Sequence, residues 1–203
     1  MSHHKAEDHH NSTRYRKGAL SMFDDYRSRK VIILSHCLLN QNSISDGTSD
    51  FPSQFNEIIE FLMINCIGMI QLPCPELLCL GLDRRDIHGA KRPLLDENTR
   101  IRELMSEPEN VQVMQHKAEE MTIQIQEYQK YGFQVTGLIG VNRSPSCGIE
   151  TTSKNGAEEQ GKGVFMEIFS KTLAEHGITI PMIGTKTSEK ETSIEKIRQF
   201  VHQ

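Results

Sequence analysis

Three of the five cysteines lie in short motifs in which a thiol could bind a metal. Cys37 belongs to Ser-His-Cys-Leu-Leu, Cys74 to Leu-Pro-Cys-Pro-Glu, and Cys147 to Ser-Pro-Ser-Cys-Gly. Thiolate is the usual ligand of iron–sulfur clusters and of zinc. Three thiolates leave the fourth position of a cubane cluster, or of a tetrahedral zinc, open to substrate, as a catalytic metal requires. The motifs therefore favour a catalytic metal centre over three ordinary buried thiols, which is the alternative.

The other two cysteines have a different setting. Cys66 extends the apolar face of a predicted helix, so we expect it to fill the core. Cys79 lies in the apolar stretch Leu-Leu-Cys-Leu, and we expect a buried thiol, although a fourth ligand is the alternative. His36 precedes Cys37 and is expected to pack or to form hydrogen bonds rather than to bind the metal.

Apolar periodicity divides the chain after residue 30 into alternating strands and helices. Continuous apolar runs, typical of buried parallel strands, predict strands over 31–34, 68–72, 135–141 and 179–184. Helical spacing predicts helices over 53–66, 96–107, 111–132, 163–176 and 193–201, with Asp96 and Ser193 as N-caps. This alternation predicts an α/β fold, a Rossmann-like open parallel sheet of about four strands with helices on both faces.

The predicted strands bring the three cysteines together. Cys37, Cys74 and Cys147 each follow one of the first three strands. Because the carboxyl ends of parallel strands meet at one edge of the sheet, where ligands bind, we expect these thiols to converge on one crevice.

The chain has 203 residues, enough for one well-cored domain. We predict a single α/β domain over 30–203, preceded by an extension over 1–29 that is disordered or partly helical, with a short helix at 19–26. A solvated tail is the expected state of this extension, although its histidines could capture a stray metal ion; these are His3, His4, His9 and His10.

Charge and cysteine usage limit the partners and the compartment. The formal charge is −4, with acidic and basic residues interspersed, so a nucleic-acid partner is not expected. No apolar run approaches the ~20 residues that span a bilayer, so no membrane partner is expected. The N-terminus lacks a secretory signal and the cysteine number is odd, which together favour a reducing cytoplasm. The oligomeric state stays open.

The three cysteine motifs in this order, followed by Gly161-Lys162-Gly163-Val164 at the start of a helix, resemble the thiouracil desulfidase family. The resemblance runs from about Val31 to Gly177. It implies a Rossmann-like domain in which Cys37, Cys74 and Cys147 bind a [4Fe–4S] cluster. It also implies a non-redox reaction in which the unique iron takes sulfur from a small thiocarbonyl substrate such as a thiopyrimidine.

The chain departs from the family pattern in the loops beside the crevice. Asn40 stands where the family usually has glycine, and the family's Arg-Tyr-Asp-Gly segment retains only Asp46 and Gly47. The family's Gly-Leu-Pro-x-Pro-Arg segment becomes Gly-Leu-Asp-Arg-Arg at 81–85. The substrate can therefore differ from thiouracil.

Replacing C=S by C=O requires a base for water and donors for developing charge. Glu76, two residues after Cys74, is the candidate general base; a carboxylate that caps the next helix is the alternative. Ser144 and Ser146 are candidates to donate hydrogen bonds to the substrate or to cluster sulfurs, or else only build their turn. The helix start at Gly163 would offer free N–H groups near the cluster.

Three arginines, Arg84, Arg85 and Arg92, lie in a loop long enough to fold over the crevice. One of them could present its planar donor fork to the substrate, although solvated surface is the expectation for each. Two other function classes stay open at this point: a zinc–thiolate enzyme or structural zinc site, and a metal-free module that binds a small molecule.

Overall fold

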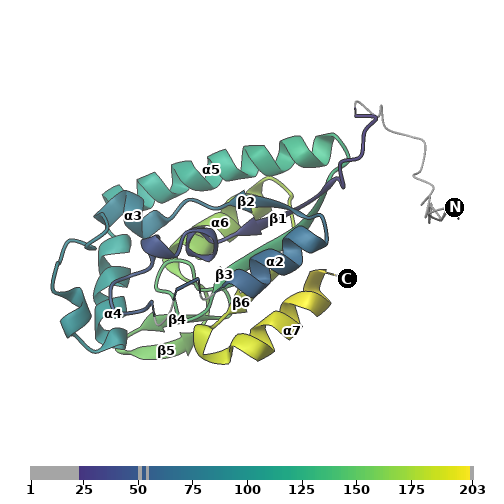
Figure 1. Ribbon diagram of the computed structural model, residues 1–203. Coiled ribbons are helices and arrows are strands. Elements are labelled where there is room, and N and C mark those ends of the chain that lie inside the picture. Colours follow the sequence, from purple (N-terminus) through teal and green to yellow (C-terminus); the bar gives the residue numbers. More distant parts are fainter. Residues whose placement is uncertain (1–22, 50–51, 54, 202–203) are drawn as a thin grey trace, which may run out of the picture.

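The computed structural model describes residues 23–49, 52–53 and 55–201 (Figure 1). The four histidines of the N-terminal extension lie outside these ranges, as does the first half of the helix predicted over 19–26. Residues 23–26 are described and are not helical.

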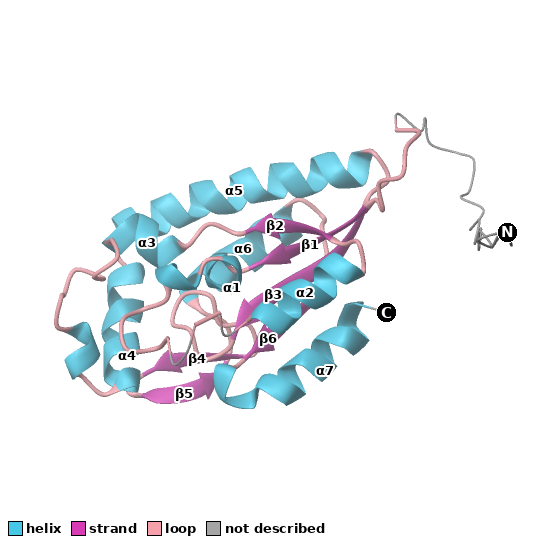
Figure 2. Ribbon diagram, in the orientation of Figure 1, coloured by secondary structure: helices cyan, strands magenta, loops and turns pink. Residues whose placement is uncertain are grey.

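Four parallel strands form the central sheet, in the order β2-β1-β3-β6 (Figure 2). They are β1 (Lys30–Leu34), β2 (Gly68–Gln71), β3 (Gln134–Val141) and β6 (Met182–Thr185). The predicted fold class is confirmed. The bounds of β1, β2 and β3 differ from the predicted ones by one residue, and β6 differs most, because it begins after Pro181, whose carbonyl accepts a hydrogen bond from the Leu138 N–H of β3.

Side chains of β1 alternate between two cores, since successive residues of a strand point to opposite faces. Ile32 and Leu34 pack with α2 (Asn56–Ile64) and α7 (Lys190–Val201). Val31 and Ile33 face the other core, which is built by α4 (Leu94–Met105), α5 (Pro108–Lys130) and α6 (Val164–Glu175). Helices thus cover both faces of the sheet (Figure 1).

A small antiparallel hairpin, β4 (Thr151–Lys154) and β5 (Ala157–Gln160), was not predicted. Its strands are largely polar and lack the apolar runs that marked the central sheet. The signal that could have found it is Asn155-Gly156, where both residues have positive φ (53° and 71°), as a two-residue hairpin turn requires.

The remaining elements are short. They are α1 (His36–Leu39), α3 (Pro75–Leu80) and the 3-10 turns η1 (Gln41–Ser43), η2 (Gly89–Lys91) and η3 (Thr187–Glu189). Two predicted caps are wrong. Asp96 lies in the first turn of α4, whose N-cap is Pro93, and Ser193 lies inside α7 with its Oγ 3.3 Å from the backbone nitrogen of Lys186.

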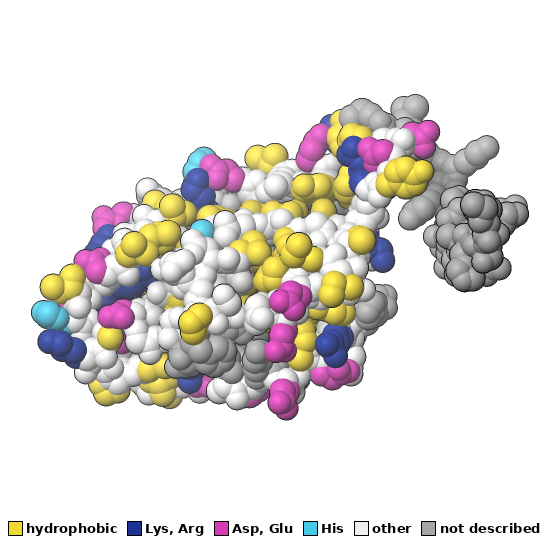
Figure 3. All heavy atoms as spheres, viewed as in Figure 1, with side chains coloured by type: hydrophobic (Ala, Val, Ile, Leu, Met, Phe, Trp, Pro, Cys, Tyr) yellow, Lys and Arg dark blue, Asp and Glu magenta, His cyan; other side chains and the backbone are white. Residues whose placement is uncertain are grey.

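Charged side chains of both signs are interspersed on the face seen in Figure 3, and no continuous patch of one sign covers it. None of the helices in the described part of the chain is both long and apolar enough to cross a bilayer.

Candidate functional site

Three cysteines follow three neighbouring strands of the sheet. Cys37 lies in α1 after β1, Cys74 is the N-cap of α3 after β2, and Cys147 lies in the loop after β3. Since β2, β1 and β3 are adjacent, the carboxyl ends of these strands bring the three cysteines into the wall of one cavity of about 160 Å³. The chain runs from β1 to β2 on one side and to β3 on the other, so the cavity lies at a topological switch point.

Local turns orient two of these thiols. The Cys74 Sγ accepts a hydrogen bond from the backbone N–H of Leu77 (3.5 Å), and Pro75 opens the helix after it. The backbone N–H of Cys147 donates to the Ser144 Oγ (3.0 Å), and the N–H of Gly148 donates to the Ser144 carbonyl (3.2 Å). The proline and glycine of the two motifs therefore serve the turns that hold the cysteines.

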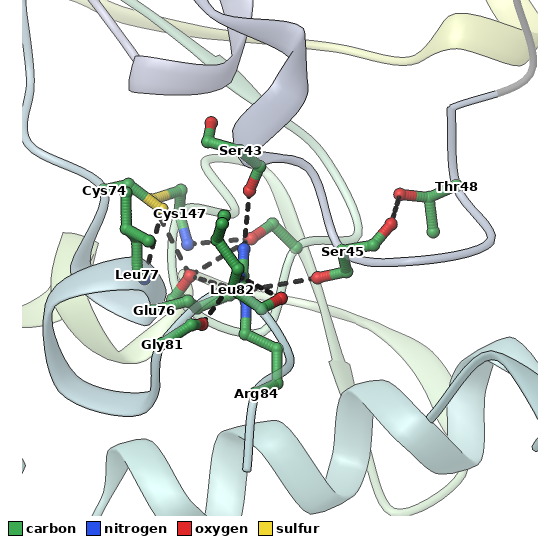
Figure 4. Close-up of polar contacts among 12 residues, drawn as sticks. Ser43, Ser45, Thr48, Cys74, Glu76, Leu77, Gly81, Leu82, Arg84 and Cys147 are labelled. Carbon is green, nitrogen blue, oxygen red and sulfur yellow. Dashed lines mark hydrogen bonds and ion pairs between the residues drawn. The ribbon is translucent and has the colours of Figure 1, made fainter. Parts of the chain in front are cut away.

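Glu76 is buried and lines the cavity, and Figure 4 shows the polar contacts of its carboxylate. Its Oε1 accepts a hydrogen bond from the Ser146 Oγ at 2.5 Å. Its Oε2 accepts hydrogen bonds from the Arg84 Nε (2.9 Å) and the Ser45 Oγ (3.1 Å). Glu76 lies in the first turn of α3, as the alternative predicted, but Cys74 is the N-cap and the Glu76 carboxylate binds Ser146, Arg84 and Ser45.

Arg84 is also buried, which corrects the expectation of a solvated surface residue. Its guanidinium donates to the Glu76 carboxylate and to the carbonyls of Ser43, Gly81 and Leu82 (2.6–3.1 Å). This places a fully paired ion pair beside the thiols, with both side chains less than 8% exposed. Each of these two buried charges would be very costly without the other.

The other two arginines of this loop are surface residues, as expected. Arg85 pairs with Glu107 (3.2 Å) and Arg92 with Asp86 (2.5 Å), and both arginine side chains are more than 40% exposed. Neither lines the cavity.

The two serines of the third motif have distinct roles in the turn. Ser146 donates to Glu76, and its Oγ lies 3.7 Å from the Cys147 Sγ. Ser144 accepts from the Cys147 N–H, and its Oγ lies 3.4 Å from that of Ser146. Ser146 thus connects the carboxylate to the cysteine loop, whereas Ser144 shapes that loop.

Gly163 is the N-cap of α6, and the expectation that this helix start offers free N–H groups is wrong. The N–H groups of Gly163, Val164 and Phe165 donate to the carbonyls of Gly148, Pro145 and Ser146 (all 3.0 Å). A Cβ at Gly163 would overlap the Ser146 carbonyl and lie 2.8 Å from the Cys147 nitrogen. Gly163 therefore permits α6 to hold the cysteine loop by its backbone.

We expect Gly163→Ala to displace this loop, lowering stability by about 1–3 kcal/mol through overpacking and lowering metal content as well. The control is Gly177→Ala, since φ at Gly177 is +67° and a Cβ there meets nothing within 4 Å. The control should lose about 1–2 kcal/mol from its left-handed backbone alone. Thermal unfolding and metal analysis test both variants. If Gly163→Ala had the same metal content and the same stability as the control Gly177→Ala, the role given to Gly163 would be contradicted.

The thiols of the cavity are held in the neutral form by their surroundings. Burial, followed by the nearby Cys74 and Glu76 charges, raises the pKa of Cys37 to about 12. Burial, followed by the same neighbouring charges, raises the pKa of Cys147 well above its usual value. The pKa of Cys74 is raised by burial and by Glu76. A cation at this site would lower these pKa values, because it stabilises the thiolates.

Thiol alkylation should follow this order in metal-free protein. At pH 8 iodoacetamide should modify Cys66 first, because it is exposed, while Cys37 and Cys147 stay unmodified until the pH rises several units or the chain unfolds. Peptide mass mapping over time measures the order, and labelling in denaturant is the control. Rapid modification of Cys37 in the folded protein would contradict the assigned pKa.

The two remaining cysteines lie away from the cavity. Cys66 is exposed in the turn after α2, with φ +55°, so the expectation that it fills the core is wrong. Cys79 packs against the core at α3, with its Sγ 3.9 Å from the Asn110 carbonyl, and does not line the cavity. This position fits a buried thiol better than a fourth ligand.

Among the described residues, no set of three or more His, Cys, Asp or Glu side chains has the spacing that one bound metal ion requires. Thiolates at about 2.3 Å from a single zinc lie within roughly 4 Å of one another. The three cysteines line the same cavity.

Sequence patterns missed several residues that hold the site. Ser45 binds Glu76 across 31 positions of the chain, and Arg102 of α4 donates to the carbonyls of Pro145 (3.2 Å) and Lys162 (3.3 Å). Asn98 and Lys186 line the cavity from α4 and from the end of β6. No local spacing marks these residues, because each acts only through a distant segment.

Comparison with known proteins agrees with this architecture. The family model of 2-thiouracil desulfurase matches residues 32–182, a range that contains all three cavity cysteines, Glu76 and the start of α6. The chain belongs to the 2-thiouracil desulfurase family. The name of the family denotes the removal of sulfur from 2-thiouracil. The matched range leaves out residues 1–31 and 183–203, which include the first two residues of β1, most of β6, η3 and α7.

A relative from Methanocaldococcus jannaschii, the uncharacterised protein MJ0003, is 32% identical over 165 residues. These residues cover 81% of this chain and 91% of that protein. No solved structure matches the chain.

Proposed function

We propose that this member of the 2-thiouracil desulfurase family binds a [4Fe–4S] cluster through Cys37, Cys74 and Cys147 and hydrolyses a small thiocarbonyl compound. The observation that carries the proposal is the cavity itself. Three thiols from the ends of three adjacent strands line it together with a buried, paired glutamate. The family name supports the desulfurase activity, and the cluster is the cofactor that this donor set fits best.

The donor set suits a cluster more than a single ion. In a cubane cluster each thiolate binds its own iron, so three ligands stand farther apart than around one zinc. Three cysteines from the ends of three separate strands can offer one thiolate to each of three irons. A metal-free binding module gives no reason to bury three thiols around one carboxylate.

A buried serine hydroxyl near Cys37 also supports a cluster, because it could donate a hydrogen bond to a cluster sulfur. Among the described residues, one fully buried side-chain polar atom lacks a hydrogen-bond partner. This atom is the Ser35 Oγ. Leaving a hydroxyl unpaired costs about 1–3 kcal/mol. Ser35 lies two residues before Cys37, and hydrogen bonds to cluster sulfurs are a common way in which proteins tune such centres.

The overall reaction is R₂C=S + H₂O → R₂C=O + H₂S, with no change of oxidation state. When bound, the cluster supplies an iron with an open position, a Lewis acid for the substrate sulfur. Glu76 accepts a proton from the attacking water, and Ser146 and Arg84 hold the two oxygens of its carboxylate. The protons lost by water leave with the sulfide as H₂S.

Anaerobic purification, followed by iron, sulfide and zinc analysis and an assay with 2-thiouracil, tests the proposal. We expect a brown protein with about four irons per chain, loss of the thiocarbonyl absorbance, and equal amounts of uracil and sulfide. Stoichiometric zinc would overturn the cofactor assignment. A fully loaded protein that releases sulfide from no thiocarbonyl compound would overturn the activity.

A further inference from the structure

One cation on the cavity wall has no partner in the described part of the protein. The guanidinium of Arg143 forms no hydrogen bond or ion pair there, although the residue is half-buried and lines the cavity. The other buried or half-buried cations of this region are paired. Arg84 binds Glu76 (2.9 Å), Arg102 binds Glu167 (3.0 Å), and Lys186 binds Glu158 (2.6 Å).

The backbone of Arg143 is held in a conformation that an arginine rarely adopts. Its φ is +67°, in the left-handed region. Its N–H donates to the Thr151 carbonyl (3.0 Å), and its own carbonyl accepts from the buried Ser153 Oγ (2.7 Å). Asn98 donates in turn to Ser153 (3.0 Å). The hairpin therefore fixes Arg143 through its main chain and leaves the side chain to the cavity, an arrangement typical of strained residues at functional sites.

Nearby acidic groups do not satisfy this charge. Glu158 lies within electrostatic reach of Arg143. Burial raises the pKa of Glu158, but the hydrogen bonds from Lys186 and Thr151 and the charges of Lys186 and Arg143 outweigh burial and lower it. Its carboxylate is already bound by Lys186. The positive charge that acts on the thiols of Cys37 and Cys74 is that of Arg84. Arg143 thus lines the cavity with a guanidinium that has no hydrogen-bond or ion-pair partner in the described part of the protein.

The size of the cavity limits what can fill this space. The cavity of about 160 Å³ would have to hold the proposed cluster beside the cysteines as well as the substrate, so the substrate has to be compact. A planar guanidinium matches a carboxylate with two parallel hydrogen bonds. We propose that Arg143 is a specificity-determining residue that binds a carboxylate carried by the thiocarbonyl substrate. This inference rests on the proposed function and names the substrate class.

The test compares 2-thiouracil with 6-carboxy-2-thiouracil in the cluster-loaded full chain. The preference, the ratio of kcat/KM for the carboxylated over the neutral compound, should favour the acid in the unaltered protein. Arg143→Gln should lower this ratio by about 10- to 100-fold, as expected for loss of a partly desolvated charge pair, and Arg143→Lys should lower it less. The matched control is Arg85→Gln, which removes a surface arginine outside the cavity and should leave the ratio unchanged. A ratio that Arg143→Gln leaves unchanged would overturn the inference.

Calorimetric binding of 6-carboxyuracil and uracil, which carry no sulfur, separates this inference from the proposed activity. Tighter binding of 6-carboxyuracil that weakens in Arg143→Gln supports the carboxylate site even if no thiocarbonyl compound is turned over. Equal binding of the two compounds overturns it. Displacement of 6-carboxyuracil by millimolar inorganic phosphate, but not by acetate, would also overturn the choice of a carboxylate. If Arg143→Gln lost iron but bound 6-carboxyuracil as tightly as the unaltered protein, the inference would also be overturned. Arg143 would then stabilise the negative charge of the cluster.

Discussion

Replacing Cys37, Cys74 or Cys147 by alanine is expected to reduce bound iron from about four per chain to less than about one. Each thiol comes from the end of a different strand, and burial and mutual repulsion keep all three neutral until a cation is present. Two remaining ligands cannot hold a cluster whose protein attachment needs three. Iron and sulfide analysis after anaerobic reconstitution measures the effect.

Two other cysteines of the chain provide the controls. Cys66→Ala should retain full iron, because Cys66 is exposed in a turn away from the cavity. Cys79→Ala should retain most of it, with a modest loss of stability from the half-buried site beside Asn110. Full cluster occupancy in Cys74→Ala would remove the three-cysteine assignment. Loss of iron in both Cys79→Ala and Cys79→Ser would show that Cys79 is a fourth ligand, which would leave no iron with an open position.

Glu76→Gln is expected to lower turnover of a thiocarbonyl substrate by about 10²–10⁴-fold, the range for loss of a positioned general base. Iron content should stay near that of the unaltered protein, since glutamine preserves the shape of the side chain. The same change should also lower stability, because Arg84 is left as a buried and unpaired charge. Breaking a buried pair in this way costs about 3–5 kcal/mol.

A double variant separates these two effects. Glu76→Gln combined with Arg84→Met removes both charges, so much of the lost stability should return. Turnover should not return, because the base is still absent. Iron, melting temperature and rate are measured on one preparation of each variant. A Glu76→Gln protein that is less stable but turns over at the normal rate per cluster would exclude Glu76 from the reaction.

The local pattern was sufficient to predict the framework of this protein. Val31 to Leu34 is buried on both faces of the sheet, so its apolar run could be recognised without knowledge of its neighbours. Parallel strands point their carboxyl ends to one edge, and this rule predicts from the sequence that Cys37, Cys74 and Cys147 lie close together. The strands themselves followed from periodicity and the shared cavity from their carboxyl ends, whereas the strand order came only from the tertiary structure.

Local pattern was misleading where a residue's environment depends on a distant segment. Cys66 continues a helical apolar spacing, but α2 ends at Ile64 and the thiol turns out to solvent. The start of α6 would leave free N–H groups in isolation, yet the carbonyls of the Cys147 loop occupy them. The polar hairpin after Gly148 carried too little apolar signal to be recognised.

Only the tertiary structure decided the polar chemistry of the cavity. Glu76 meets Ser146 across 70 positions, and it meets Arg84 because the loop after α3 folds back over its own helix. Arg143 faces the cavity because the hairpin holds its backbone in a left-handed conformation. Such contacts depend on how separate segments approach in space, which hydrophobic periodicity does not encode, whereas strands and their ends are local properties of the chain. The positions of the cysteines could therefore be predicted from the sequence. The partners of Glu76 and the unpaired guanidinium of Arg143 in the described part of the protein could not be predicted.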